Sequence, residues 1–104
     1  MLSTFRTYQL AVEFYRRCQE LSAPGFLKNQ LLRASSSVAL NLSEGSAKLS
    51  PKDRRRFYGI ALASLRESQT ALELNSTQVP ALIEMADHLG ACLYRLIHPK
   101  PVTK

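Results

Sequence analysis

Apolar residues recur at intervals of three and four along four segments of the chain, and this spacing predicts four amphipathic helices. Glycine, proline and short polar residues cluster between these segments and mark the breaks. The third segment has the clearest start, because Ser50 is a good N-cap residue and Pro51 suits the first helical position. The expected helices cover about residues 4–21, 26–47, 51–74 and 79–97.

Each segment carries two adjacent apolar seams, and the connections between segments are short. This combination is typical of an all-α, antiparallel up-down-up-down four-helix bundle. A chain of 104 residues has room for one core, so we expect a single domain over residues 1–98 and a flexible basic tail at 99–104. The last two helices have more apolar positions than a monomeric bundle needs, which favours a homo-oligomer. The alternative is that both seams lie inside one bundle.

Three polar residues, Asn41, Ser64 and Glu67, interrupt the apolar seams of the second and third helices. Buried polar groups cost free energy unless they find partners. In an antiparallel pair with a short turn, Arg33 falls opposite Glu67, and Glu44 falls opposite the arginines of 54–56. Asn41 could reach backbone or Ser64, and Gly45 either lets the two helices approach closely or ends the second one. The predicted polar lock therefore comprises Arg33, Asn41, Glu44, Ser64 and Glu67.

The two carboxylates of this lock are poor candidates for catalysis. General acid–base chemistry needs two carboxylates that flank one reacting bond, whereas Glu44 and Glu67 are expected far apart, each beside its own arginine. An ion-pair lock that fixes the register of the helices is therefore the favoured interpretation.

Basic residues outnumber acidic ones by 14 to 8, which leaves a formal charge of +6. The basic run consists of Lys48, Lys52, Arg54, Arg55 and Arg56. Cations at a helix start oppose the helix dipole, so their concentration there calls for another explanation. We interpret the run as a surface that contacts the phosphates of RNA or DNA. The alternative is a solvated helix start, and no signature of sequence-specific base recognition is present.

Other candidate chemistry is weak. Glu84, His88 and Cys92 stand four residues apart and could ligate a metal, but Cys92 lies on an apolar seam, where a buried thiol is favoured. Ser35–Ser37 lacks a nearby histidine, and the four glycines form no phosphate-binding loop. We therefore expect no catalytic residue, no metal and no cofactor. The two distant cysteines, an N-terminus unlike a signal peptide and the lack of a spanning segment favour the cytoplasm and no membrane partner.

Residues 30–45, QLLRASSSVALNLSEG, carry a QLRRA-type start, a small-residue stretch and an Asn-x-x-Glu-Gly ending. Lys52, Arg56-Phe57 and the segment from Ile60 to Glu67 continue this pattern. It resembles the signature of the four-helix-bundle family named for 23S rRNA intervening sequences. The chain departs from it at Ala63, where the family usually has glycine, in lacking a tryptophan in the first helix, and in its short connection at 75–80.

The resemblance implies a small bacterial bundle that assembles as a homopentamer and has no catalytic activity. The family includes reading frames inside insertions of large-subunit rRNA genes. It is similar to the accessory protein of diversity-generating retroelements, which works with a reverse transcriptase and nucleic acid. Together with the basic run, this favours a non-enzymatic accessory or scaffold protein that binds RNA or DNA. The alternative is a protein–protein interaction module with no nucleic-acid role.

Overall fold

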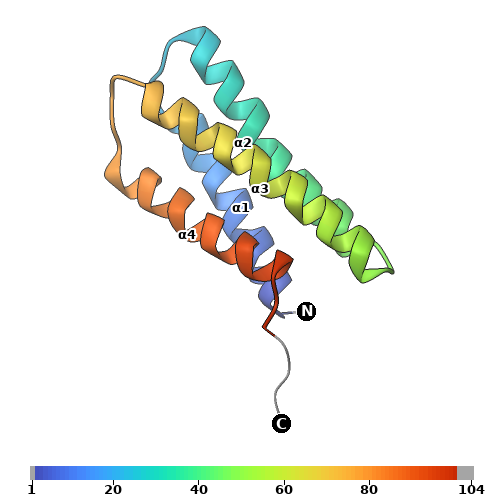
Figure 1. Cartoon of the computed structure of the whole chain (residues 1–104). Helices are drawn as coiled ribbons and strands as arrows, with labels where there is room; N and C mark the ends of the chain where they lie inside the picture. The colour runs from blue at the N-terminus through green and yellow to red at the C-terminus, as the bar shows by residue number, and fades with distance from the viewer. Residues whose placement is uncertain (1, 101–104) are drawn as a thin grey trace.

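The computed structural model describes residues 2–100 and contains four α-helices (Figure 1). The all-α four-helix fold predicted from the periodicity is therefore confirmed. The bounds of the four helices lie within two residues of those expected. The helices are α1 (Leu2–Glu20), α2 (Gly25–Ser46), α3 (Pro51–Leu74) and α4 (Pro80–Ile97). Residues 101–104 of the expected basic tail lie outside the described part of the chain.

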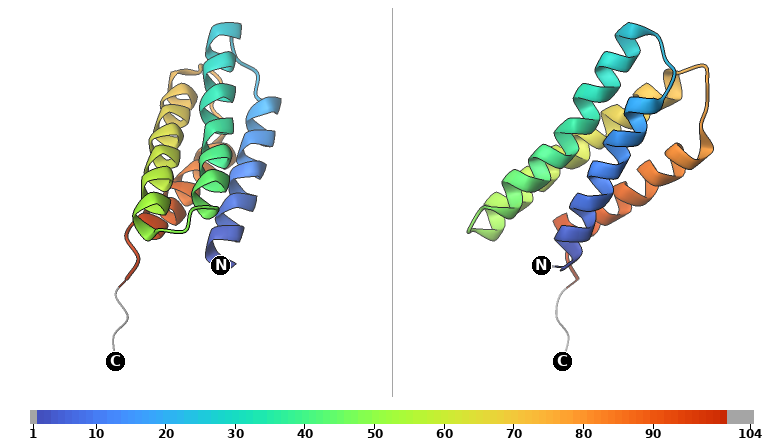
Figure 2. Two further views of the ribbon diagram at one scale, coloured as in Figure 1. Left: turned by 90° about the vertical axis from the view of Figure 1, so that its right-hand side faces the viewer. Right: turned by 180° about the vertical axis from the view of Figure 1, so that it is seen from behind.

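The helices run alternately up and down around one core, and each packs against the two that neighbour it in this cycle (Figures 1 and 2). The α2–α3 contact is the most extensive and the α1–α4 contact the least. Because the helices alternate in direction, the start of α1, the α2–α3 turn and the end of α4 all lie at one end of the bundle (Figure 2). We call this the basic end, and we call the opposite end, with the α1–α2 and α3–α4 connections, the closed end.

The core is built from one face of each helix. In α1, Ala11, Phe14 and Cys18 are fully buried, whereas Phe5 and Tyr8 are 57% and 38% exposed. The fully buried side chains that occupy the most volume are Phe14, Leu31, Leu42, Leu65, Leu89 and Leu93. Burying large side chains of this kind stabilises a fold by about 1.5–3 kcal/mol each.

Large apolar side chains remain exposed on all four helices, including Ile60 and Leu74 of α3 and Ile83 and Tyr94 of α4. Phe26 and Leu40 of α2 are 76% and 68% exposed, and Leu74 of α3 is 69% exposed. In α4 Leu82, Leu89 and Leu93 are buried. The three most exposed of the large apolar helix residues thus lie on α2 and α3.

Candidate nucleic-acid interface

The basic end owes its shape to a tight approach between the end of α2 and the start of α3. Gly45 is buried, and a Cβ atom placed there would come within 2.8 Å of a Tyr58 ring carbon and 2.9 Å of the Phe57 Cβ. The close helix approach that was one of two expectations for Gly45 is therefore confirmed. Ser50 accepts a hydrogen bond from the Asp53 backbone N–H at 3.0 Å, and Pro51 begins the helix, which confirms the predicted N-cap.

The five side chains of the basic run have different surroundings. Lys48 forms an ion pair with Glu44, with 3.1 Å between Nζ and Oε2. Arg54 points back across the turn and donates hydrogen bonds to the carbonyl oxygens of Lys48 and Leu49 at 3.0 and 2.9 Å. The guanidinium of Arg56 lies 4.5 Å from the centre of the Phe57 ring, in cation–π contact.

Most of this charge has no acidic partner. Within residues 2–100 the only two ion pairs are Glu13–Arg17 and Glu44–Lys48. Lys52 and the three arginines 54–56 therefore have no carboxylate within 4 Å in that part of the chain. Lys52, Arg55 and Arg56 are also exposed, so their charges face solvent.

Glu44 was expected to pair with an arginine of 54–56, and this prediction is wrong. The partner is Lys48, four residues further along the same helix, a spacing that places two side chains next to each other. Arg54 instead donates to backbone carbonyl oxygens that follow the end of α2. The turn thus engages Arg54 through its backbone carbonyl oxygens, whereas Arg55 and Arg56 have no ion-pair partner within residues 2–100.

The neutral part of the polar lock forms, with a partner that the sequence interpretation missed. The Ser64 hydroxyl is buried and lies 2.8 Å from the hydroxyl of Ser37. The Asn41 side-chain amide donates to the Ser37 carbonyl oxygen at 2.9 Å and to the Ser37 hydroxyl at 3.0 Å. Asn41 thus reaches backbone as expected and Ser64 only through Ser37. The helical spacing of four between Ser37 and Asn41 was the available signal.

The charged part of the lock does not form within the chain. Arg33 and Glu67 are both exposed, and no ion pair joins them in the described structure. The Ser37–Ser64 contact sets the register, and in this register Ser68 faces the core. Glu67 is displaced by about 100° around the helix and faces solvent. Its placement on a core seam was therefore wrong.

The fold adds basic residues to this end that are remote in sequence. Arg6 lies in the second turn of α1, Arg95 lies in the last turn of α4, and Lys100 follows α4. Most carboxylates lie towards the closed end, where Glu20 and Glu73 lie in the last turns of α1 and α3 and Glu84 lies in the second turn of α4. The net charge is thus concentrated at the basic end. The sequence prediction missed this concentration of charge, although the expected alternation of helix directions implies it.

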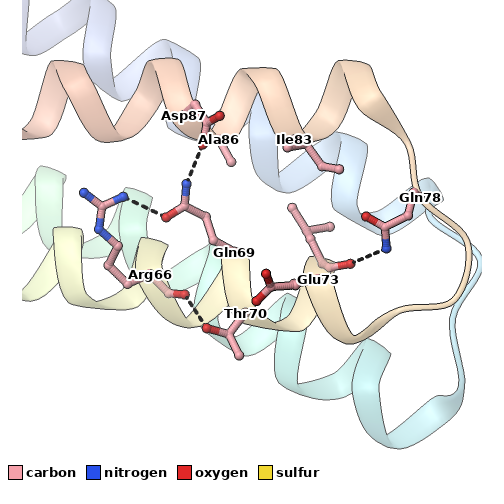
Figure 3. Close-up of a pocket in the computed structure, with 9 residues that line it drawn as sticks. Arg66, Gln69, Thr70, Glu73, Gln78, Ile83, Ala86 and Asp87 are labelled. Atoms are coloured by element: carbon pink, nitrogen blue, oxygen red, sulfur yellow. Dashed lines mark hydrogen bonds between the residues drawn. The ribbon is translucent and has the colours of Figure 1, made fainter.

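A cavity of about 380 Å³ between α3 and α4, at the closed end, is a weaker candidate site (Figure 3). The Gln69 side chain bridges two of its three charged groups: its oxygen accepts from Arg66 at 2.8 Å, and its nitrogen donates to Asp87 at 2.9 Å. Arg66 and Asp87 are therefore already engaged, and Glu73 is the third charged group of the lining.

The remaining chemical candidates do not assemble into a site. His88 Nε2 lies 3.9 Å from Cys92 Sγ, but no three His, Cys, Asp or Glu residues between positions 2 and 100 come together as a metal site requires. Cys92 is half-buried and not part of the closed core. In the same range, none of the helices combines the length and the apolar character needed to cross a membrane.

Comparison with protein families identifies the family of the chain. The family model described as 23S rRNA-intervening sequence protein matches residues 4–93, from the first turn of α1 almost to the end of α4. Most of the chain is therefore covered, including α1 and α4, which lie outside the residues 30–67 that carry the resemblance. Comparison with curated proteins and with solved structures gives no match.

Proposed function

The chain belongs to the family of 23S rRNA-intervening sequence proteins, and from this premise we propose that it is a non-enzymatic, oligomeric scaffold that binds the backbone of RNA or DNA through its basic end. The observation that carries the proposal is the set of basic side chains without acidic partners at the α2–α3 turn. We place this role in the bacterial cytoplasm, in complexes with nucleic acid and with a second protein such as a reverse transcriptase.

Phosphate is the chemical group that this end suits best. Lys52 and Arg55 project from the first turns of α3 into solvent, without a carboxylate within 4 Å in the described chain. Such side chains bind phosphates by charge-assisted hydrogen bonds and release counterions from the nucleic acid. Of the two neighbouring aromatic residues near the turn, Tyr58 is buried, and Phe57 is half-buried and in contact with Lys48 and Arg56. This supports contact with the backbone, not stacking on bases.

Self-association has its own support, on the outer surface of the α2–α3 pair. The Ser37–Ser64 contact fixes which residues of α2 and α3 lie at the same height along the bundle. Moving three or four residues from this contact along each helix, and then seven more, reaches exposed residues of both helices that lie side by side. The outer α2–α3 face so defined has apolar ends and a charged middle: Phe26 with Leu74, Arg33 with Glu67, and Leu40 with Ile60.

This face suits another copy of the chain. Exposed apolar residues on both sides of an oppositely charged pair give a surface that can bury area and complete its ion pairs across an interface. Arg33 and Glu67, predicted to form a lock within the chain, would then form it between subunits. The family resemblance sets the expected number of copies at five.

Light scattering coupled to size-exclusion chromatography tests the assembly. We expect the wild type to elute as an oligomer and the variant Leu40→Glu/Ile60→Glu to elute as a smaller species, because the new charges would be buried in the interface. Leu49→Glu is the control, since Leu49 is 95% exposed in the turn, outside the face. A wild-type monomer, or an oligomer that the double variant leaves intact, contradicts this part of the proposal.

Titration with fluorescent RNA and DNA tests the binding. We expect both to bind at low salt and the logarithm of the affinity to fall linearly with the logarithm of the salt concentration, with a slope of roughly −0.7 to −0.9 for each phosphate contact. No binding of either nucleic acid at about 20 mM salt contradicts the proposal. That result would favour the alternative, a protein–protein interaction module, for which Leu49 at the tip of the turn offers an apolar contact.

A further inference from the structure

A second basic surface lies at the same end of the molecule, on the side away from the α2–α3 pair. An open groove of about 1200 Å³ separates the first turns of α1 from the last turns of α4. It lies along the least extensive of the four helix contacts. The side chains that determine its chemistry are Arg6, Thr7, Leu10, His88, Cys92 and Arg95.

The groove has cationic side chains on both walls. Arg6 projects from α1 and Arg95 from α4, both are exposed, and neither has a carboxylate within 4 Å in residues 2–100. The Arg95 guanidinium donates a weak hydrogen bond to Cys92 Sγ at 3.4 Å. No Asp or Glu lines the groove, whereas carboxylates line the cavity between α3 and α4 at the closed end.

One polar group of the groove lining, the Thr7 hydroxyl, is already satisfied. Thr7 is buried and donates its hydroxyl hydrogen bond to the Ser3 carbonyl oxygen at 2.8 Å. Leu10 and Leu96 supply apolar wall between the charges. The groove thus offers two permanent cations, with His88 beside them, and no acidic group to repel an anion. A polyanion whose charges repeat at regular intervals matches this arrangement.

We propose that the α1–α4 groove is a second phosphate-binding surface, which holds the same RNA or DNA strand that contacts the α2–α3 turn. This inference rests on the proposed function and extends it, because it makes the binding surface span both sides of the basic end. It also requires the groove to stay open in the oligomer, which agrees with self-association through the outer α2–α3 face.

Matched double variants test the inference through the salt dependence of RNA binding. The variant Arg6→Gln/Arg95→Gln should reduce the salt slope by roughly 1.4 for a single strand, since each lost phosphate contact removes about 0.7. At 0.1 M salt, this corresponds to a loss of affinity of about 25-fold. The control Arg16→Gln/Arg17→Gln also removes two positive charges from exposed side chains, but near the other end of α1. It should leave the salt slope unchanged.

The outcomes separate this inference from the proposed function. If Lys52→Gln/Arg55→Gln weakens binding while Arg6→Gln/Arg95→Gln does not, the groove is not a binding surface and the proposed function stands. If the wild type binds neither RNA nor DNA at low salt, both are overturned. Equal losses in the groove variant and the Arg16/Arg17 control would show a response to net charge alone and would overturn the inference.

Cys92 provides a second readout that needs no substitution of a basic residue. Its thiol lies in the groove, whereas Cys18 is fully buried and serves as an internal control. N-ethylmaleimide should label Cys92 in the free protein, and saturating RNA should slow this labelling several-fold. An unchanged rate with RNA overturns the inference. So does a free oligomer in which Cys92 is not labelled, because another subunit would then cover the groove.

Discussion

The two ends of this bundle differ in whether their polar side chains have hydrogen-bond partners within the chain. At the closed end, Asn75 is buried and its side chain donates to the carbonyl oxygens of Ser22 and Thr77 at 3.0 and 2.9 Å. Gln78 donates to the Leu72 carbonyl oxygen at 3.1 Å, and the Lys28 ammonium reaches the Leu21 carbonyl oxygen. These bonds tie the α1–α2 and α3–α4 connections to each other and to the helix ends.

At the basic end, by contrast, Arg54 is the one member of the basic run that returns to the backbone, and Lys52 and Arg55 project into solvent. Groups with partners inside the chain contribute to stability, and groups without them are available to another molecule. Under the proposed function, we therefore expect the hydrogen-bonded polar groups of the closed end to contribute to stability and the exposed cations of the basic end to contribute to binding. Removing a polar side chain of one set should affect one property and leave the other nearly unaltered.

The largest expected difference is in the reactivity of the two thiols, one towards each end. Burial raises the pKa of the Cys18 thiol to about 12, against a partial lowering by Ser35 and Lys28. Labelling of Cys18 requires opening of the core, so its rate at pH 7 should be on the order of a thousandfold slower than that of Cys92. Mass spectrometry after timed exposure to N-ethylmaleimide measures both rates. Equal rates would show that the core at the closed end is open.

The same pKa gives a pH dependence of stability. The unfolded thiol ionises near its ordinary pKa of 9.0, whereas the folded one stays protonated up to about pH 12. The stability that Cys18 contributes is therefore complete below pH 9 and is lost progressively between pH 9 and 12. Urea unfolding of the wild type and Cys18→Ala should show a steeper decline for the wild type over this range. Parallel curves contradict the assignment.

Asn75→Ala should be the most destabilising single change in either connection. It leaves the Ser22 and Thr77 carbonyl oxygens without their donor in a half-buried loop, at a cost of about 2 kcal/mol. Chemical denaturation measures this loss, and RNA affinity at a temperature where the variant is folded should be unchanged. A loss below about 0.5 kcal/mol would mean that the closed end is not held by these bonds.

Two glycine substitutions near the basic end should have opposite signs. In Gly45→Ala the new methyl group would lie 2.9 Å from the Phe57 Cβ, which cannot move without moving α3. The resulting overpacking should cost about 1–2 kcal/mol beyond the gain in helix propensity. Gly59→Ala is the control: its Cβ meets nothing within 4 Å, so it should stabilise the protein by up to about 1 kcal/mol. Two changes of the same sign would contradict the close approach.

Neutralising the basic end should change stability least. Arg55→Gln removes a cation from a helix start, where it opposes the dipole, so stability should stay equal or rise by up to about 0.5 kcal/mol at low salt. Thermal unfolding at 10 and 200 mM salt measures the change. A clear loss of stability would show that Arg55 has a structural partner and would weaken the division between the two ends.

Local rules predicted the helices well. Periodicity, the Ser50 cap and Pro51 led to the four-helix fold, because each depends on neighbours a few residues apart. Side-chain pairing across helices was less predictable. An error of one residue in the α2–α3 register exchanges Ser68 for Glu67 at the core, and this is how the Arg33–Glu67 lock was misplaced.

In the candidate site, too, features that are local in sequence were predictable and features that depend on the packing of the helices were not. The basic run was visible because its residues are close in sequence, whereas Arg6 and Arg95 joined it only once the helix directions placed the start of α1 and the end of α4 at the same end of the bundle as the turn. The roles within the run could not be read from charge alone. Arg54 as a donor to backbone carbonyl oxygens and Lys48 as the partner of Glu44 follow from the geometry of the turn.

The most direct test of the division between the two ends compares RNA affinity in two variants of equal net charge. Lys52→Gln/Arg55→Gln alters the basic end, and Arg16→Gln/Arg17→Gln alters α1 near the closed end. At 0.1 M salt we predict that the first variant binds fluorescent RNA about 25-fold more weakly than the wild type, with a salt slope smaller by roughly 1.4, and that the second binds as the wild type does. Equal losses of affinity in the two variants would contradict the account.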